Sequence, residues 1–147
     1  MIAVDTNILV YAADAGAGNR HFDAKGVIKH VIAQGALMLP LQVLGEFCRV
    51  ALKKLLFEAE QTERFVIAWS AVARVESYGL ADIRAALRAQ ANHGLSFWDG
   101  LIWAVCERSG VELLLSEDLQ DGRRLGGVTF LDPFNPASAA RLGLARP

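Results

Sequence analysis

Three aspartates stand where a strand is expected to end or a helix to begin. Asp5 follows the apolar residues 2–4, Asp118 lies just past the apolar run 111–115, and Asp99 lies in the first turn of a predicted helix. In an open parallel sheet, ligands bind beyond the carboxyl ends of the strands. Two strand ends and a helix start can therefore bring these three carboxylates to one edge of a sheet.

Carboxylates that gather at one place favour a bound cation. Like charges raise one another's pKa values unless a positive charge neutralises them, and no Lys or Arg is adjacent in sequence to Asp5 or Asp99. Carboxylate, hydroxyl and amide oxygens are hard ligands that suit Mg²⁺ or Mn²⁺. The three histidines, His21, His30 and His93, are scattered along the chain, which disfavours a zinc site.

Each aspartate also has an explanation that requires no chemistry. Asp5 could cap a helix that begins near Ile8. Ser96 and Asp99 have the spacing of a capping box, and Asp118 could begin a turn. Taken singly, each is better explained in this way, because helix starts favour acids for electrostatic reasons alone. Their joint occurrence at the ends of predicted elements is what favours a site.

Glu46 is a weaker candidate by periodicity. The apolar stripe of its predicted helix leaves Glu46 on the opposite face, beside Gln42, Arg49 and Lys53, and a solvated pair with Arg49 would account for it. Asp99, by contrast, falls on the flank of the apolar stripe of its helix. A half-sheltered position of this kind suits a metal ligand.

The elements that would position these residues alternate between strands and helices. Apolar patterns predict strands over residues 2–5, 36–39, 111–116 and 128–134, and helices over 21–35, 41–56, 58–75, 81–94 and 96–110. Residues 116–127 are expected to form a loop, and the tail 135–147 is left open. This alternation predicts the α/β class, with one domain over residues 1–147, a mainly parallel central sheet and helices on both faces. Phe22 lies at helical spacing with Val27, Ile28, Val31 and Ile32, and Trp98 and Trp103 are expected in the core rather than as base-stacking platforms.

Composition narrows the possible classes. A chain of 147 residues suits one compact domain, and a hydrophobic share of 53% fits buried parallel strands or an oligomer face. The net charge of -1 excludes global basicity, so nucleic-acid binding would need a local basic patch. Two cysteines without a CxxC motif, the lack of a signal peptide and the lack of a long apolar run favour a cytoplasmic protein without a membrane span.

Sequence motifs of several other chemistries do not occur. DLQDG lacks the alternating oxygen ligands of a calcium loop, and GAGNR lacks the GK[ST] ending of a phosphate loop. There is no GxSxG nucleophile elbow. A phosphatase of the haloacid-dehalogenase type would need a second aspartate where Asn7 stands.

Four stretches in a fixed order resemble a known family. AVDTNILVYAAD at the start, Glu46 in the helix after the second strand, SFWDGLIWA in the middle and LLLSEDLQDG near the end are similar to the PIN-domain ribonucleases, particularly the VapC-type toxins of bacterial toxin–antitoxin pairs. The resemblance spans nearly the whole chain, and the order of the stretches is more specific than any single acid.

The resemblance implies an acidic quartet of Asp5, Glu46, Asp99 and Asp118, with Asp5 and Asp99 as the principal metal ligands. It implies supporting roles for the polar residues beside them, namely Thr6, Asn7 and Ser116. Asp121 competes with Asp118 for the last place in the quartet. Asp118 is favoured because it lies nearer the end of the strand.

The implied activity is Mg²⁺- or Mn²⁺-dependent endonucleolytic cleavage of RNA. The basic residues that could grip the RNA backbone are Arg49, Lys53, Lys54, Arg123 and Arg124, although solvated surface is the ordinary role of each. The resemblance further implies a homodimer and a cognate antitoxin that inserts a segment at the acidic groove. The alternative hypothesis is a catalytically idle PIN-like module that binds a protein or RNA without cutting it.

Overall fold

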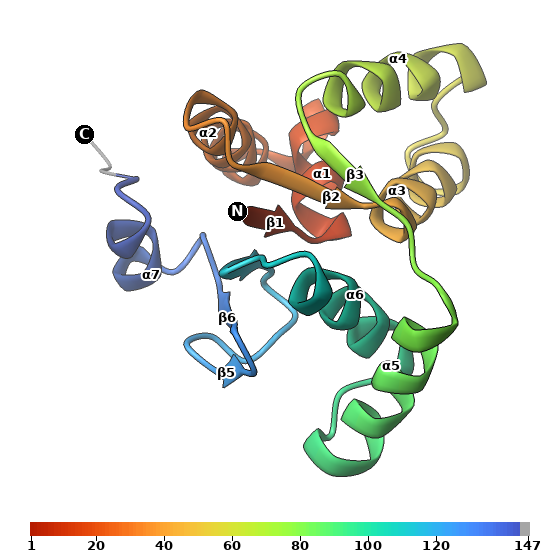
Figure 1. Cartoon of the computed structure of the whole chain (residues 1–147). Coiled ribbons are helices and arrows are strands. Elements are labelled where there is room, and N and C mark those ends of the chain that lie inside the picture. Colours follow the sequence, from red (N-terminus) through yellow and green to blue (C-terminus); the bar gives the residue numbers. More distant parts are fainter. Residues whose placement is uncertain (145–147) are drawn as a thin grey trace.

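The computed structural model describes residues 1–144 and has a six-stranded sheet covered by helices (Figure 1). The last three residues of the tail predicted over 135–147 lie outside the described residues. The sheet order is β3-β2-β1-β4-β6-β5, and only the β5–β6 pair is antiparallel. The strands are β1 (Ile2–Val4), β2 (Leu37–Pro40), β3 (Arg74–Glu76), β4 (Leu113–Leu115), β5 (Arg124–Leu125) and β6 (Val128–Leu131).

Helices connect the parallel strands and cover the sheet. They are α1 (Thr6–Ala13), α2 (Asn19–Ala33), α3 (Leu41–Lys53), α4 (Ala59–Ser70), α5 (Leu80–His93), α6 (Phe97–Arg108) and α7 (Pro136–Arg141), with a short 3-10 turn, η1, at Ala15–Ala17. The predicted α/β class with a mainly parallel sheet is confirmed.

The order of the strands reverses beside β1. The chain passes from β1 to β2 and β3, then returns to place β4 on the other side of β1. Because crossovers between parallel strands are right-handed, connections that run in opposite directions place their helices on opposite faces. Helices α1 to α4 therefore cover one face, and α5 and α6 cover the other. The carboxyl ends of β1 and β4 form the switch point at which such sheets bind ligands.

The core follows the predicted apolar stripe of α3. Phe47 is fully buried and meets Trp69 of α4 edge to face, with ring centroids 4.9 Å apart. Phe65 completes this cluster at 6.0 Å from Phe47. Burial of aromatic rings supplies much of the stability of a small domain, and here it anchors α3, the helix that carries Glu46.

Two strands of the structure, β3 and β5, were not predicted. The helix expected over 58–75 ends at Ser70, and residues 74–76 form β3, which pairs in parallel with β2. Arg74 and Val75 are exposed, so this edge strand has no alternating apolar pattern by which to recognise it. In the segment expected to be a loop, residues 124–125 form β5, which turns into β6 through Gly126 and Gly127.

Phe22 has the helical spacing of the other apolar residues of α2 but does not face the core. Its side chain is 70% exposed, because the buried face of α2 is formed by Ala24, Val27, Ile28 and Val31. Phe22 lies near the start of α2, where it contacts the ring of His21 instead. A single apolar residue at the edge of a stripe is often solvent-exposed in this way.

Helix length and the two cysteines can be compared with the sequence-based expectations. In the part of the chain that the structure describes, every helix is too short or too polar to cross a bilayer. Cys48 and Cys106 are both free thiols, with Cys106 buried and Cys48 half-buried.

The contrast between Phe47 and Phe22 gives a stability test. Phe47→Ala should lower the free energy of unfolding by about 3–5 kcal/mol, because it leaves a cavity among aromatic rings. Phe22→Ala should change it by less than about 0.5 kcal/mol, because the ring is exposed. Urea unfolding followed by circular dichroism measures both. Equal effects of the two substitutions would contradict the assignment of the core.

Candidate active site

The site is built around Asp5, which ends β1 and is 6% exposed. Its backbone N–H donates to Leu115 O of β4 at 2.8 Å, so the two strands stay paired up to the acid. One carboxylate oxygen accepts from the backbone N–H of Thr6 at 2.7 Å, and the other accepts from Ser116 Oγ at 2.7 Å. Asp5 therefore caps α1 and also lies at the centre of the candidate site. Helix capping and a role in the site are thus compatible explanations of this residue.

Each supporting residue predicted from the sequence holds one acid. Ser116 holds Asp5, as described above. Thr6 Oγ1 donates to Glu46 at 2.7 Å, and Asn7 Nδ2 donates to Asp118 at 2.9 Å. Ser116 Oγ also accepts from the backbone N–H of Asp118 at 3.1 Å. The ends of β1 and β4 and the outer face of α3 thus bring three of the four acids into one connected network.

Asp99 is related to the other acids by the electrostatic effect of their charges on its pKa. It is half-buried at the start of α6, where its backbone N–H donates to the capping Ser96 Oγ at 3.2 Å. Burial raises the pKa of Asp99, the hydrogen bond from Ser96 lowers it, and the charges of Asp118 and Glu46 raise it further.

Burial also dominates the electrostatics of Asp5. It raises the pKa of Asp5 from 3.8 to about 6, against the hydrogen bonds from Ser116 and Thr6, which lower it. The charges of Asp99 and Glu46 add to the increase. A desolvated carboxylate beside two others is an unfavourable arrangement without a cation.

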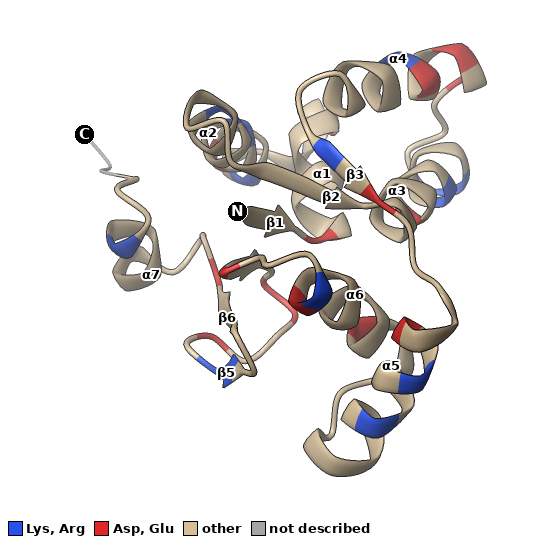
Figure 2. Cartoon of the chain, in the orientation of Figure 1, with Lys and Arg blue, Asp and Glu red and all other residues tan. Residues whose placement is uncertain are grey.

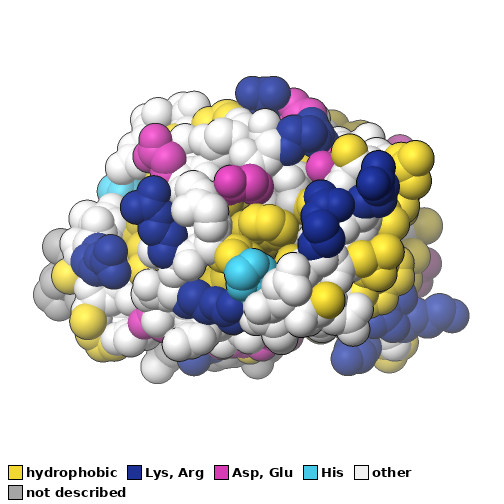
Figure 3. All heavy atoms as spheres, turned by 60° about the horizontal axis from the view of Figure 1, so that its bottom comes forward, with side chains coloured by type: hydrophobic (Ala, Val, Ile, Leu, Met, Phe, Trp, Pro, Cys, Tyr) yellow, Lys and Arg dark blue, Asp and Glu magenta, His cyan; other side chains and the backbone are white. Residues whose placement is uncertain are grey.

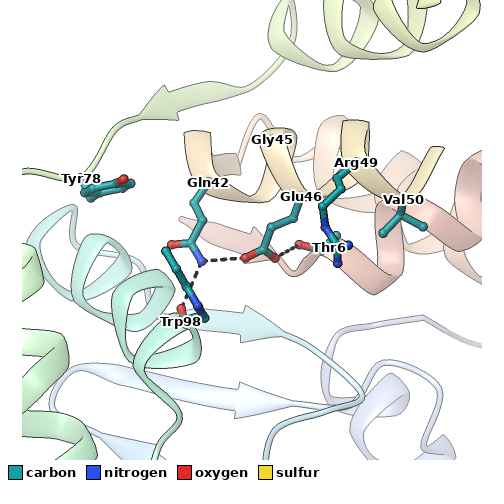
Figure 4. A pocket seen from close by; sticks show the side chains of 8 residues that line it. All are labelled: Thr6, Gln42, Gly45, Glu46, Arg49, Val50, Tyr78 and Trp98. Atoms are coloured by element: carbon teal, nitrogen blue, oxygen red, sulfur yellow. Dashed lines mark hydrogen bonds between the residues drawn. The ribbon is translucent and has the colours of Figure 1, made fainter. Parts of the chain in front are cut away.

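Glu46 accepts hydrogen bonds from side chains of two different helices. Among the contacts of the described residues, its hydrogen-bond donors are Thr6 and, at 2.8 Å, Gln42 Nε2, and not Arg49. Gln42 Nε2 also donates to the backbone oxygen of Trp98 at 3.2 Å, which joins α3 to α6 (Figure 4). The outward face of α3, which made Glu46 a weak candidate by periodicity, therefore faces a groove.

The groove beside Glu46 has a volume of about 520 Å³. Trp98 and Tyr78 line it together with Thr6, Gln42, Gly45, Glu46, Arg49 and Val50 (Figure 4). Trp98 is 57% exposed, so the expectation that it faces the core is wrong. Trp98 is the second residue of α6 and lies one turn before the buried Leu101 and Ile102. Trp103, one and a half turns later, is partly buried against the core and donates to Leu125 O.

Asp118 and Asp121 have different surroundings. Asp118 is bound to Asn7 and Ser116 in the acidic network, as described above. Asp121 accepts from the backbone N–H of Asp132 at 2.9 Å and from Asn135 and Ser138 at 2.8 Å. Burial acts to raise the pKa of Asp121, but these hydrogen bonds and the charge of Arg141 outweigh it and lower the pKa. Asp121 therefore fastens the segment before α7, whereas Asp118 faces the other acids.

A second set of contacts holds the residue between Ser116 and Asp118. Glu117 accepts from the hydroxyl of Tyr11 and lies 3.5 Å from the guanidinium of Arg20. Arg20 itself lies over the ring of Phe134, 4.2 Å from its centroid. The hydrogen bond to Glu117 raises the pKa of Tyr11 to about 12. These contacts fix the loop that carries Ser116 and Asp118.

The candidate RNA-binding residues lie in two places. Arg49 lines the groove, and Lys53 and Lys54 are exposed at the end of α3. Arg123 and Arg124 donate instead to the backbone oxygens of His93 and Gly126. Figure 2 shows basic residues on most elements rather than on one side. On the face in Figure 3, several Lys and Arg side chains surround exposed apolar ones.

The donor set fits a hard divalent cation by its chemistry. Within residues 1–144, no three His, Cys, Asp or Glu side chains are already grouped closely enough to hold an ion. Glu46 is half-buried and accepts a hydrogen bond from Thr6, whereas Asp118 is exposed and accepts one from Asn7. Asn7 Oδ1 is buried and accepts no hydrogen bond from the described residues. An unused amide oxygen beside carboxylates is a ligand type that Mg²⁺ accepts.

Gln42, Tyr78 and Trp98 were not identified as functional residues from the sequence. The spacing of Gln42 and Glu46, four residues apart on a polar helix face, was a usable signal for the first. The positions of Tyr78 and Trp98 depend on how α5 and α6 pack, and no local pattern reports that packing.

The fold and site define a class: a doubly wound α/β protein with an acidic pocket at its switch point. The model of a family described as the PIN domain matches residues 2–124. The chain therefore belongs to the PIN domain family, as the resemblance of its motifs implied. No curated protein matches this chain.

Solved structures of similar fold come from three bacteria. A Mycobacterium tuberculosis structure titled VapC20, a toxin that cleaves the sarcin–ricin loop, is 24% identical, with a TM-score of 0.64 and 100% coverage of both chains. A toxin–antitoxin complex from Klebsiella pneumoniae is 22% identical, with a TM-score of 0.61, covering 88% of this chain and 96% of that one. VapBC2 from Rickettsia felis, bound to a promoter DNA fragment, is 14% identical, with a TM-score of 0.63 and coverage of 88% and 97%.

The raised pKa of Asp5 predicts how metal-free stability depends on pH. The folded protein holds the Asp5 proton more tightly than the unfolded chain, so this contribution to stability is present below about pH 4 and is lost as the pH rises through about 6. A shift from 3.8 to about 6 corresponds to about 3 kcal/mol. In chelator, Asp5→Asn should therefore be more stable than the parent at pH 8 and similar to it near pH 4.

Urea unfolding of both proteins at the two pH values measures this difference. Glu112→Gln, at an exposed position away from the pocket, is the control and should follow the parent at both. An Asp5→Asn protein that is less stable than the parent at pH 8 would contradict the burial argument.

Proposed function

We propose that this chain is a metal-dependent endoribonuclease that acts as the toxin of a type II toxin–antitoxin pair. The observation that carries the proposal is the desolvated carboxylate of Asp5, whose pKa responds to the charges of Asp99 and Glu46. An acidic cluster at a switch point, braced by hydroxyl and amide side chains, is a suitable site for a cation that acts on phosphodiesters.

Membership of the PIN domain family supports the nuclease part of the proposal. The toxin part draws on the structural neighbours, because two are titled as VapC toxin or VapBC structures and one as a toxin–antitoxin complex. Partners proposed on this basis are an RNA substrate, a cognate antitoxin and a second copy of the chain, in the cytoplasm.

The four acids would share the task of holding Mg²⁺ or Mn²⁺. Asp5 and Asp99 would be the principal ligands, and Glu46 and Asp118 would complete the pocket. When bound, such an ion lowers the pKa of a water ligand and neutralises charge on a phosphate. Ser116 and Thr6 would orient Asp5 and Glu46, and Arg49 would attract the RNA backbone toward the pocket.

The principal test is cleavage of total cellular RNA by the purified protein, freed of any bound partner. The parent should give discrete products with Mg²⁺ or Mn²⁺ and none with chelator. Asp99→Asn should reduce cleavage roughly 100-fold or more, since loss of a direct ligand should cost more than loss of a residue that orients one. The thermal unfolding of Asp99→Asn should remain cooperative.

Cleavage that persists in both Asp99→Asn and Asp5→Asn would overturn the assignment of the site. A parent that binds RNA without cutting it in any metal would favour the idle binding module instead.

Asp118 and Asp121 provide a matched pair of substitutions. Asp118→Asn should strongly reduce cleavage with little loss of stability, because Asp118 is exposed and faces the other acids. Asp121→Asn should keep cleavage and lower the free energy of unfolding by about 1–2 kcal/mol, because Asp121 accepts hydrogen bonds from Asp132, Asn135 and Ser138. RNA cleavage and urea unfolding of the two variants test this. The reverse pattern would assign the metal-facing role to Asp121.

A further inference from the structure

We infer that the groove between Tyr78 and Trp98 is a subsite for one unpaired nucleobase of an RNA strand whose phosphate lies at the acidic pocket. This inference rests on the proposed ribonuclease function and adds to it how the substrate is recognised. It assigns Trp98 and Tyr78 as stacking surfaces and Arg49 as the neighbouring phosphate contact.

The groove joins the acidic network at one end. Thr6 and Glu46, which are hydrogen-bonded to each other, belong to its lining, as do the rings of Tyr78 and Trp98 (Figure 4). A strand that places a phosphate at the acids would therefore run its next base along this groove. Its volume of about 520 Å³ falls within the range of about 300–1,000 Å³ found for small-molecule sites.

Both aromatic rings are more exposed than their size favours. Trp98 is 57% exposed and Tyr78 is 44% exposed. Indole and phenol rings left in water at a groove wall offer stacking faces at little cost in conformational entropy, because each side chain has only two rotatable bonds. Phe97 contacts the Trp98 ring edge to face, at 5.1 Å between centroids, and supports it from one side.

The backbone on each side of Tyr78 is held by an ion pair between the buried Asp82 and the exposed Arg108. Arg108 of α6 donates to Ser77 O at 2.9 Å, and Asp82 accepts from the backbone N–H of Gly79 at 2.9 Å. Arg108 and Asp82 also pair with each other, with a distance of 3.0 Å between Nε and Oδ1. The exposed ring is therefore carried by a rigid segment rather than by a free loop.

Trp98 is fixed to the acid in a comparable way. Gln42 Nε2 donates both to Glu46 and to the backbone oxygen of Trp98. A carboxylate and a carbonyl can only accept, so the orientation of the Gln42 amide is determined. Gln42 therefore links the backbone that carries Trp98 to the acid at the other end of the groove.

The charge beside the groove favours a nucleic acid over an apolar peptide. Arg49 lines the groove, and Lys53 lies one turn further along the same face of α3. Stacking on aromatic rings next to cations is how proteins bind single-stranded nucleic acid. Bases in a duplex are already stacked, so the groove would take an unpaired base from a loop or a single strand.

The test measures RNA binding separately from cleavage. The reference protein for binding is Asp99→Asn in chelator, chosen so that the RNA is not cut. It is titrated with single-stranded oligoadenylate or oligouridylate of about 8 nucleotides, a length within the usual site sizes. A ribose-phosphate chain of the same length without bases is the second probe. Adding Trp98→Ala should weaken binding of the base-bearing probes roughly 5- to 150-fold, which corresponds to the loss of one stacked base.

Matched variants separate stacking from folding and charge. Trp98→Phe should retain most of the affinity, because it keeps a stacking face, and Tyr78→Ala should weaken binding in the same direction as Trp98→Ala. Phe22→Ala removes an aromatic ring on α2 that is even more exposed and does not line the groove, and it should have no effect. All variants should bind the ribose-phosphate probe, which has no bases, with the same affinity.

Unchanged affinity for the base-bearing probes in Trp98→Ala overturns the subsite and leaves the groove to a peptide segment. If that result accompanies metal-dependent RNA cleavage by the wild-type protein, the proposed function stands and only the subsite fails. A wild-type protein that neither binds nor cleaves RNA removes both.

Discussion

Burial of the Asp5 carboxylate is the constraint on which the site depends. A charge that is 6% exposed at the end of a three-residue strand is costly unless polar groups surround it. Thr6 N–H and Ser116 Oγ supply two such groups, and Ser116 can do so only because β4 lies directly beside β1. The sheet order and the acidic pocket are therefore two aspects of one arrangement.

The polar residues around Asp5 also join the elements of the fold. Thr6 connects α1 to α3 through Glu46, and Asn7 connects α1 to the segment after β4 through Asp118. Each of these hydrogen bonds gives one acid a neutral partner and leaves its charge in place. The carboxylates remain close to one another without direct contact, and the pKa values of Asp5 and Asp99 stay raised. Such a pocket is electrostatically prepared for a cation.

The two sides of the pocket differ in chemistry. Toward β4 lie hydroxyl and carboxylate groups, including Glu117 with its partners Tyr11 and Arg20. Toward α3 and α5 lie the exposed rings of the groove. Arg108 and Asp82 hold the segment that carries Tyr78, so an ion pair remote from the acids determines the shape of the groove beside them. Long-range packing of α5 against α6 thereby bears on the proposed recognition of substrate.

Local patterns in the sequence predicted the fold class and drew attention to Asp5, Asp99 and Asp118, whereas Glu46, Thr6, Asn7 and Ser116 entered only through the resemblance to the family. Strands such as β1 and β4 are short apolar runs that end at polar residues, and amphipathic helices such as α3 show their buried face directly. Asp5 could be recognised because it follows β1 immediately, and Asp118 because it lies just past β4. Local patterns failed where the partner was distant in sequence: β3 exists because β2 lies beside it, and its own residues are exposed.

Tertiary structure decided the remaining features. Periodicity placed Glu46 on an outward face and could not tell that α1 and α6 approach that face to form a groove. It could not separate Asp118 from Asp121, because the choice rests on hydrogen bonds from Asn7 to the first and from Asn135 and Ser138 to the second. Trp98 was expected in the core because a tryptophan in an apolar helix is usually buried, and its exposure follows from its place in the first turn of α6. Spacing along a chain reports which face of an element a residue occupies, whereas only the packed structure determines what that face meets.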